Sequence, residues 1–259
     1  MPSNNNGVIY VASGKRHFEE AMLSISSVRS CMPSIPVTLF TDQLLANSDP
    51  LIRIEPLAPN EIRRDFCAKI LPMIRSPYEK TLFLDTDTYM CSSCEELFPM
   101  LDRFDIMAVP DPWRCDYAFE TVPLSFPTFN SGVIAFRRSE ATENFFKDWM
   151  RNHDEIFSNK MRAQEDQPAF RHTLYYSDLK LFPLTPEFNL RTYYPCFVGG
   201  HSKVRIIHDR HPFIPQMARE LNRSSRPRIY GPLSVRLVAF YYASKAFKVS
   251  KRILSGFIR

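Results

Sequence analysis

The sequence "TLFLDTDTYM", residues 81–90, joins an apolar run to two carboxylates, Asp85 and Asp87, with one threonine between them. Residues 81–85 have the short apolar pattern of a buried strand. Two carboxylates at the end of such a strand repel each other and lose hydration, unless a cation or solvent offsets that cost. The stretch therefore predicts a buried strand of an α/β sheet, with a charged site at its carboxyl end.

Segments on both sides of this stretch alternate between strand-like and helix-like patterns. Apolar and β-branched runs predict strands at residues 7–13, 35–42, 104–111 and 131–137, and a later strand that ends at His208. Helical spacing predicts helices at residues 17–29, 63–74, 140–157 and 165–174. The order strand, helix, strand is the parallel unit, so we expect a mostly parallel α/β sheet flanked by helices.

Composition indicates one folded domain. The chain has 259 residues, of which 44% are apolar and 13% aromatic, enough for a substantial buried core. Its 7 glycines and 21 prolines show no period, which excludes a repeat array or a low-complexity linker. We expect a catalytic domain over residues 1–232, followed by a separate segment over residues 233–259.

Neither a secretory signal nor a disulfide framework is visible. The N-terminus lacks the basic, apolar and small-residue order of a signal peptide, and no uncharged apolar run of about 18 residues occurs, so we expect a cytoplasmic protein. Six cysteines are too thinly spread for a disulfide scaffold. The "CSSC" of residues 91–94 lacks the partners of a zinc site, and structural thiols are the expected interpretation.

Basic charge is concentrated near the C-terminus. Residues 201–259 contain 13 Lys and Arg against Asp209 and Glu220, a balance of +11, which leaves residues 1–200 at −6. Segment 233–259 has the pattern of an amphipathic basic helix, which either docks on an anionic inner membrane surface or packs on its own domain. Nucleic-acid binding is not expected, because no reader motif accompanies the charge. Apolar residues Leu237, Phe240, Tyr241, Phe247, Ile253 and Leu254 lie broadly to one side of this helix, and Lys245, Lys248, Lys251 and Arg252 to the other.

The chemistry of the aspartate pair favours a hard divalent cation. Carboxylate oxygens suit Mg²⁺ or Mn²⁺, particularly when a diphosphate supplies further oxygens. Asp-x-Asp alone is weak support, because a chain with 14 aspartates is expected to contain such a pair by chance. Its position at the end of an apolar strand is what favours a site.

Four segments together resemble a known enzyme family. They are "FCAKILPMIRSPYEKTLFLDTDT" (66–88), "FNSGVIAFR" (129–137), "QEDQPAF" (164–170) and "VRIIHDR" (204–210). Their order and spacing resemble nucleotide-sugar glycosyltransferases of the GT-A fold, most of all family 8, the glycogenin and bacterial galactosyltransferase group, over about residues 7–211. The resemblance implies a GT-A fold and transfer of a sugar from a UDP-sugar to a saccharide, lipid-linked or protein acceptor.

The resemblance also implies roles for particular residues. Asp85, Asp87 and His208 would hold Mn²⁺ or Mg²⁺ against the donor diphosphate, and Lys69 would be the basic residue near the phosphates. Arg63 or Arg64 could share the role of Lys69. Among the remaining positions, Asn130, Ser131 and Gly132 would line the donor sugar, Asp166 and Gln167 would contact it near the reacting carbon, and Ala12, Ser13 and Gly14 would hold the base and ribose.

Each of these residues also has a structural alternative. Lys69 could be a solvated helix lysine, His208 a surface histidine, and residues 130–132 a turn into a core strand. Acidic residues in "QEDQ" could serve the helix dipole alone.

The sequence departs from the family after His208. The family commonly continues with a glycine and a Lys-Pro-Trp motif, whereas this chain reads "HDRHPF". Arg210 or His211 would then have to supply the phosphate contact. The departure leaves the donor and the stereochemical outcome open.

Three other functions share parts of the pattern. A haloacid-dehalogenase-like phosphatase pairs a nucleophilic with an acid-base aspartate, but its motif wants Thr or Val at Tyr89 and normally opens the domain. A nucleotidyltransferase would have a glycine-rich basic loop after the first strand. A non-catalytic nucleotide- or carbohydrate-binding scaffold would not need the intact metal residues. We therefore predict a metal-dependent glycosyltransferase, in which a cation stabilises the departing nucleoside diphosphate.

Overall fold

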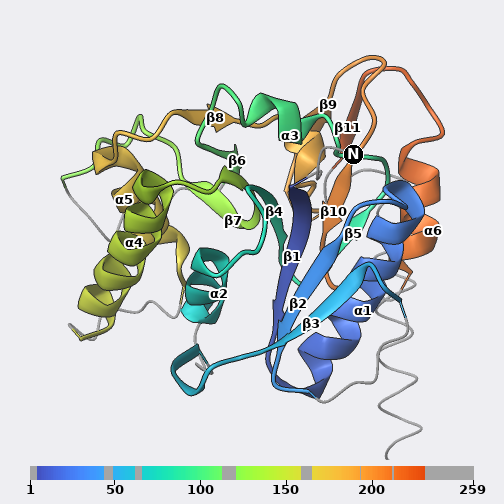
Figure 1. Ribbon diagram of the computed structural model, residues 1–259. Coiled ribbons are helices and arrows are strands. Elements are labelled where there is room, and N and C mark those ends of the chain that lie inside the picture. The colour runs from blue at the N-terminus through green and yellow to red at the C-terminus, as the bar shows by residue number, and fades with distance from the viewer. Residues whose placement is uncertain are drawn as a thin grey trace, which may run out of the picture.

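The computed structural model describes residues 5–43, 49–61, 66–112, 121–158, 165–192, 194–211 and 213–230 (Figure 1). The predictions for Arg63, Arg64 and segment 233–259 lie outside the described residues. In the described part of the chain, no helix is both long and apolar enough to cross a membrane.

A seven-stranded sheet lies at the centre of the described structure, in the order β3-β2-β1-β4-β7-β6-β8. Its β7 runs antiparallel to both neighbours, and the other adjacent strands are parallel, which confirms the mostly parallel α/β sheet. The strands are β1 (Asn6–Ala12), β2 (Val37–Thr41), β3 (Ile52–Pro56), β4 (Lys80–Leu84), β6 (Ile106–Pro110), β7 (Phe129–Arg137) and β8 (Leu181–Pro183).

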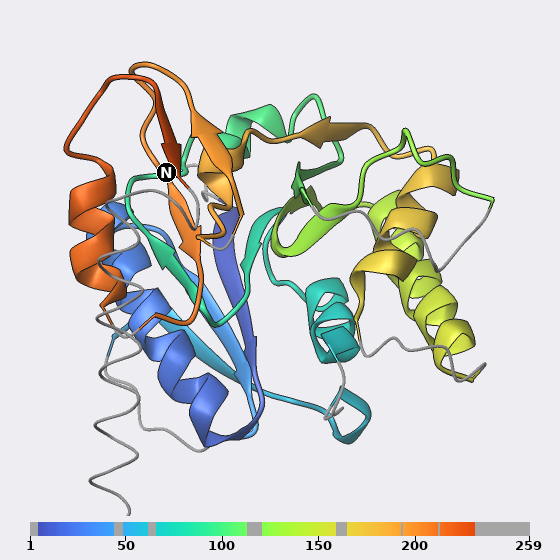
Figure 2. The same cartoon turned by 180° about the vertical axis from the view of Figure 1, so that it is seen from behind.

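Helices cover both faces of this sheet, so its central strands are buried on both sides. Figures 1 and 2 show α1 (Gly14–Cys31) on one face and α2 (Ile70–Ile74), α4 (Glu140–Ser158) and α5 (Gln167–Tyr176) on the other. Strands of this kind read as continuous apolar runs, as in β4, where every residue from Thr81 to Leu84 is buried.

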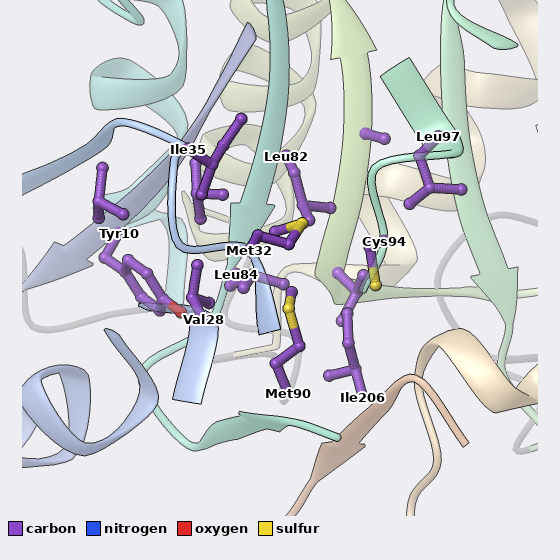
Figure 3. Close-up of a cluster of buried hydrophobic side chains, with 14 of the residues drawn as sticks. Tyr10, Val28, Met32, Ile35, Leu82, Leu84, Met90, Cys94, Leu97 and Ile206 are labelled. Atoms are coloured by element: carbon purple, nitrogen blue, oxygen red, sulfur yellow. The ribbon is translucent and has the colours of Figure 1, made fainter. Parts of the chain in front are cut away.

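Two hydrophobic cores follow from the alternation of side chains along the strands. Leu82 and Leu84 of β4 pack with Tyr10 and with Val28 of α1 (Figure 3), near Leu97 of the short α3 (Leu97–Met100). Between them, Phe83 points to the opposite core. There it joins an aromatic cluster contributed by β7, α4 and α5, namely Phe136, Phe145, Phe146, Trp149 and Phe170.

Two small antiparallel sheets lie beside the main one. β5 (Thr88–Met90) pairs with β10 (Ile206–His208), and β9 (Cys196–Val198) pairs with β11 (Arg228–Tyr230), with α6 (Ile214–Leu221) packed on a shared apolar cluster. The sequence did not predict β3, β5, β8, β9 or β11. The β5–β10 register places His208 opposite Thr88, directly after the aspartate pair.

The cysteines of the described residues are free thiols, as expected. Burial raises the pKa of Cys91 to about 12, so its reactive thiolate is suppressed at neutral pH. Cys94 is buried in the core on the α1 side. Both are therefore structural residues.

Candidate functional site

The topology brings the candidate residues to one edge of the sheet. β1, β4 and β6 end there, and the antiparallel β7 begins there. Ser13, Asp85 and Asp111 follow the three parallel strands, and Asn130 opens β7. From β1 through β4 and β7 to β6, the edge therefore presents Ser13, Asp85, Asn130 and Asp111 in that order.

Asp85, Asp87 and His208 form a compact group at this edge. One ligand atom from each lies within 4.8 Å of the others, which is the spacing that a single metal ion can bridge. His208 Nε2 is 3.3 Å from Asp87 Oδ1 and 3.8 Å from Asp85 Oδ2. The histidine side chain is only 11% exposed, so the alternative of an ordinary surface histidine is wrong.

Two asparagines hold the His208 ring in place. The distance from His208 Nδ1 to Asn189 Oδ1 is 3.0 Å, and Asn189 Nδ2 donates to Asn130 Oδ1 at 2.8 Å. When Nδ1 carries the proton and donates to Asn189, Nε2 keeps its lone pair on the side of Asp87. This is the second-shell arrangement that orients metal-binding histidines.

The backbone of β7 approaches these side chains very closely at Gly132. A Cβ atom added there would lie 2.2 Å from His208 Cε1 and 2.8 Å from Asp85 Oδ2. The Gly132 carbonyl also accepts the backbone N–H of Asp85 at 2.8 Å. Glycine is therefore required by space at this position.

The two carboxylates differ in acidity because their surroundings differ. Burial, together with the negative charges of Asp87 and Asp166, raises the pKa of Asp85 by more than the charges of Lys69 and His208 lower it. Burial acts the same way on Asp87, but the hydrogen bond and charge of His208 and the charge of Arg210 outweigh it, so the pKa of Asp87 is held well below its usual range. A divalent cation would favour the ionised form of both groups.

Lys69 is buried between two acidic side chains, at the junction of a 3₁₀ turn and α2. Its Nζ lies 3.2 Å from Asp85 Oδ1 and 3.0 Å from Asp166 Oδ2, and it donates to Ser131 Oγ at 3.0 Å. Burial alone would lower the pKa of Lys69, but the two carboxylates outweigh it and raise the pKa above its usual value. The alternative of a solvated helix lysine is therefore wrong.

Asp166 stands at the start of α5, and its carboxylate is directed to Ser131 and Lys69. Its side chain makes no capping hydrogen bond, and Oδ2 accepts from Ser131 Oγ at 2.7 Å. The Trp149 indole donates to the Asp166 carbonyl at 3.0 Å and fixes the backbone here. Gln167 follows as a half-buried residue at the first position of α5.

Arg210, in the segment after β10, lies beside the Asp85–Asp87–His208 group. Its Nη1 is 3.4 Å from Asp87 Oδ2, and its Nε donates to Glu20 of α1 at 3.1 Å. Thr86 Oγ1 also donates to Glu20, at 3.3 Å. An exposed cationic side chain is thus held beside the aspartate pair.

Asp42, the residue after β2, accepts hydrogen bonds from the two residues that follow β1. Ala12 is the last residue of β1, Ser13 Oγ donates to Asp42 Oδ2 at 2.8 Å, and the Gly14 amide donates to Asp42 Oδ1 at 2.9 Å. Gly14 has a φ of +77°, a conformation that favours glycine. These three residues therefore lie at the same edge of the sheet as the Asp85–Asp87–His208 group, on its β1 side.

A cavity of about 250 Å³ adjoins the group on the β6 side. Asn130 and Asn189, which link to His208, form one border, and Asp111 and Arg191 line it as well. Arg191 Nη1 is 3.0 Å from Asp111 Oδ2, and Asn130 Nδ2 donates to the same oxygen at 3.1 Å. Its walls are rich in proline, contributed by Pro110, Pro112, Pro127, Pro186 and Pro195.

Several of these residues were not found by sequence reasoning. Glu20, Asp42, Asp111, Asn189 and Arg191 lie in no recognised motif, and their positions become informative only when the strand ends meet. Asp42 and Asp111 carried a signal, because each ends a predicted strand as Asp85 does.

Comparisons with known proteins place the fold. No protein-family model matches the sequence, and no curated protein matches it. Among solved structures, an active-site mutant of LgtC matches with a TM-score of 0.59 and 14% identity, over 83% of this chain and 94% of that one. The galactosyltransferase LgtC in complex with donor and acceptor sugar analogues matches with a TM-score of 0.58 and 15% identity, over 83% of this chain and 96% of that one. The chain therefore has the GT-A fold of these glycosyltransferase structures.

Proposed function

We propose that this protein is a metal-dependent glycosyltransferase that uses a nucleotide-sugar donor, in the first place a UDP-sugar. The observation that carries the proposal is the Asp85–Asp87–His208 group, placed at the carboxyl edge of a GT-A sheet with its histidine oriented by Asn189. Two carboxylates and an imidazole suit Mn²⁺ or Mg²⁺.

In this proposal the three residues hold the cation, which when bound offsets the charge of the departing nucleoside diphosphate. Lys69 keeps Asp85 and Asp166 in place, and Arg210 supplies a cation toward the diphosphate. Ala12 and Ser13, on the β1 side, face the nucleoside. Asn130, Ser131, Gly132, Asp166 and Gln167 lie on the opposite side of the metal group, toward the sugar.

The acceptor is proposed as a glycan or a lipid-linked saccharide. The structural neighbour LgtC has been crystallised with donor and acceptor sugar analogues. Peripheral contact of segment 233–259 with an anionic membrane remains part of the proposal on the strength of its sequence alone, and co-sedimentation with anionic but not neutral vesicles would test it.

A panel of nucleotide-sugars tests the function. We expect Mn²⁺-dependent release of UDP from one UDP-sugar, and loss of that release in Asp87→Ala. The control Asp148→Ala removes a 45% exposed carboxylate on α4, and should keep the activity. Phosphate release from a simple ester would instead favour a phosphatase. Unchanged Mn²⁺-dependent activity in Asp87→Ala would refute the assignment of the metal site.

A further inference from the structure

Among the described residues that line the cavity between β6, β7 and residues 186–192 and 194–196, one cationic side chain is directed to its contents. Of its described lining residues, only Asp111 and Arg191 carry charge. The Asp111 side chain is 1% exposed and its Oδ2 already accepts from Arg191 and Asn130, whereas the Arg191 side chain is 29% exposed. A molecule in the cavity therefore meets the guanidinium and not the carboxylate.

Arg191 is held in place and still has free N–H groups that can donate hydrogen bonds. Its Nη1 binds Asp111, and its guanidinium stacks over the Tyr194 ring at 5.1 Å from the centroid. Within the described residues, its other guanidinium nitrogens have no hydrogen-bond partner. A planar, pre-oriented guanidinium with free N–H groups is suited to bidentate recognition of an oxyanion.

Much of the remaining surface of the cavity is apolar, beside the amides of Asn130 and Asn189, and this apolar part matches the C–H face of a sugar ring. Proline side chains make up much of the wall, and a water-poor wall strengthens a charge-assisted hydrogen bond. A volume of about 250 Å³ accommodates a single sugar residue. The combination favours a sugar with an anionic group over a neutral one.

The position of the cavity relative to the metal group indicates which substrate it would hold. Along the sheet edge, the β1 end with Ser13 lies on one side of Asp85, and the cavity beyond Asn130 lies on the other. With the nucleotide on the β1 side and the donor sugar against Ser131 and Gly132, which do not line the cavity, the part of the edge beyond Asn130 is left for the second substrate. Asn189, which contacts both His208 and the cavity, lies between the two.

We propose that this cavity is the acceptor subsite, and that it selects an acceptor sugar with an anionic group, a carboxylate or a phosphate, through Arg191. The assignment of the cavity to an acceptor rests on the proposed glycosyltransferase function. The preference for an anionic sugar rests on the cavity itself.

Binding measurements on the full chain test the proposal without turnover. The probes are methyl β-glucuronide, the neutral methyl β-glucoside and glucose 6-phosphate, titrated calorimetrically in the presence of Mn²⁺ and UDP. We expect at least one anionic probe to bind about tenfold or more tightly than the glucoside, with an advantage that shrinks as salt rises. The tighter of the two anionic probes identifies carboxylate or phosphate as the group.

Arg191→Gln should abolish this preference, and Arg205→Gln is its matched control. Arg205 is 24% exposed, also pairs with a carboxylate and also stacks on an aromatic ring, but it lies outside the cavity. Equal affinity of wild-type protein for charged and neutral sugars, or a preference that survives in Arg191→Gln, would overturn the proposal.

Binding of UDP with Mn²⁺, measured separately in each variant, distinguishes the two hypotheses. If UDP binds and no anionic preference exists, the cavity proposal fails and the proposed function stands. If the preference exists and UDP does not bind, the glycosyltransferase function fails and the acceptor role fails with it. Unaltered UDP binding in Arg191→Gln also shows that this variant folds.

Discussion

Gly132 lies where His208 and Asp85 approach the backbone of β7 too closely for any side chain. The substitution Gly132→Ala would place a methyl group 2.2 Å from His208 Cε1, 2.7 Å from His208 Nδ1 and 2.8 Å from Asp85 Oδ2. Because all three distances are below 3.0 Å, the histidine ring must move. Movement of the ring displaces Nδ1, the atom that forms the hydrogen bond to Asn189.

The expected cost follows from these contacts. Overpacking of a well-packed interior costs about 1–3 kcal/mol, and a lost hydrogen bond about 1 kcal/mol. We therefore expect the free energy of unfolding to fall by about 2–4 kcal/mol in Gly132→Ala. Disturbing the second shell of a metal ligand costs about 10- to 100-fold in affinity, so Mn²⁺ binding should weaken by that factor.

Urea denaturation and calorimetric titration with Mn²⁺ in the presence of UDP measure both effects. Gly199→Ala is the control, because the atom nearest to its new Cβ is Ser202 Oγ, at an ordinary 3.6 Å. If Gly132→Ala matched Gly199→Ala in both stability and Mn²⁺ affinity, the proposed crowding of His208 would be refuted. If stability fell while Mn²⁺ affinity stayed unchanged, the crowding would affect packing but not the binding of the metal ion.

Two further predictions concern buried charge. Lys69→Met leaves the buried Asp166 and the partly exposed Asp85 without their cation, and should lower the free energy of unfolding by about 3–5 kcal/mol. The exposed control Lys147→Met should change it by less than about 0.5 kcal/mol. Similar losses in the two urea curves would contradict this prediction. Burial alone would raise the pKa of Asp105, but the Lys180 amide and the Arg137 guanidinium outweigh it and lower the pKa. Its stabilising contribution is therefore present above the pKa of the unfolded chain and is lost as pH falls through the folded pKa. Asp105→Asn should cost about 1–3 kcal/mol at neutral pH, and the difference from wild type in denaturation curves should shrink in acid; a constant difference would count against the ion pair.

Local patterns in the sequence determined the central strands of the main sheet, but not its edge strands β3 and β8, and part of the site. The apolar run before Asp85 is buried on both faces in β4, and residues 130–132 open β7 as predicted. Asp166 also begins a helix as predicted. These features depend on short apolar periods and on helix-start residues, which neighbouring residues in the chain encode by themselves.

Only the tertiary structure decided how the site is completed. His208 reaches the aspartates because β10 pairs with β5, a strand too short to show a period of its own. Glu20 accepts a hydrogen bond from Arg210, and Asn189 contacts His208, and neither Glu20 nor Asn189 lies in a motif. The sequence by itself determined the long buried strands and the long helices, because local periodicity encodes burial there; the three-residue strands are too short to show a period. The partners of each polar side chain depend on which strand ends meet at one edge of the sheet, and that is set by packing between segments far apart in the chain.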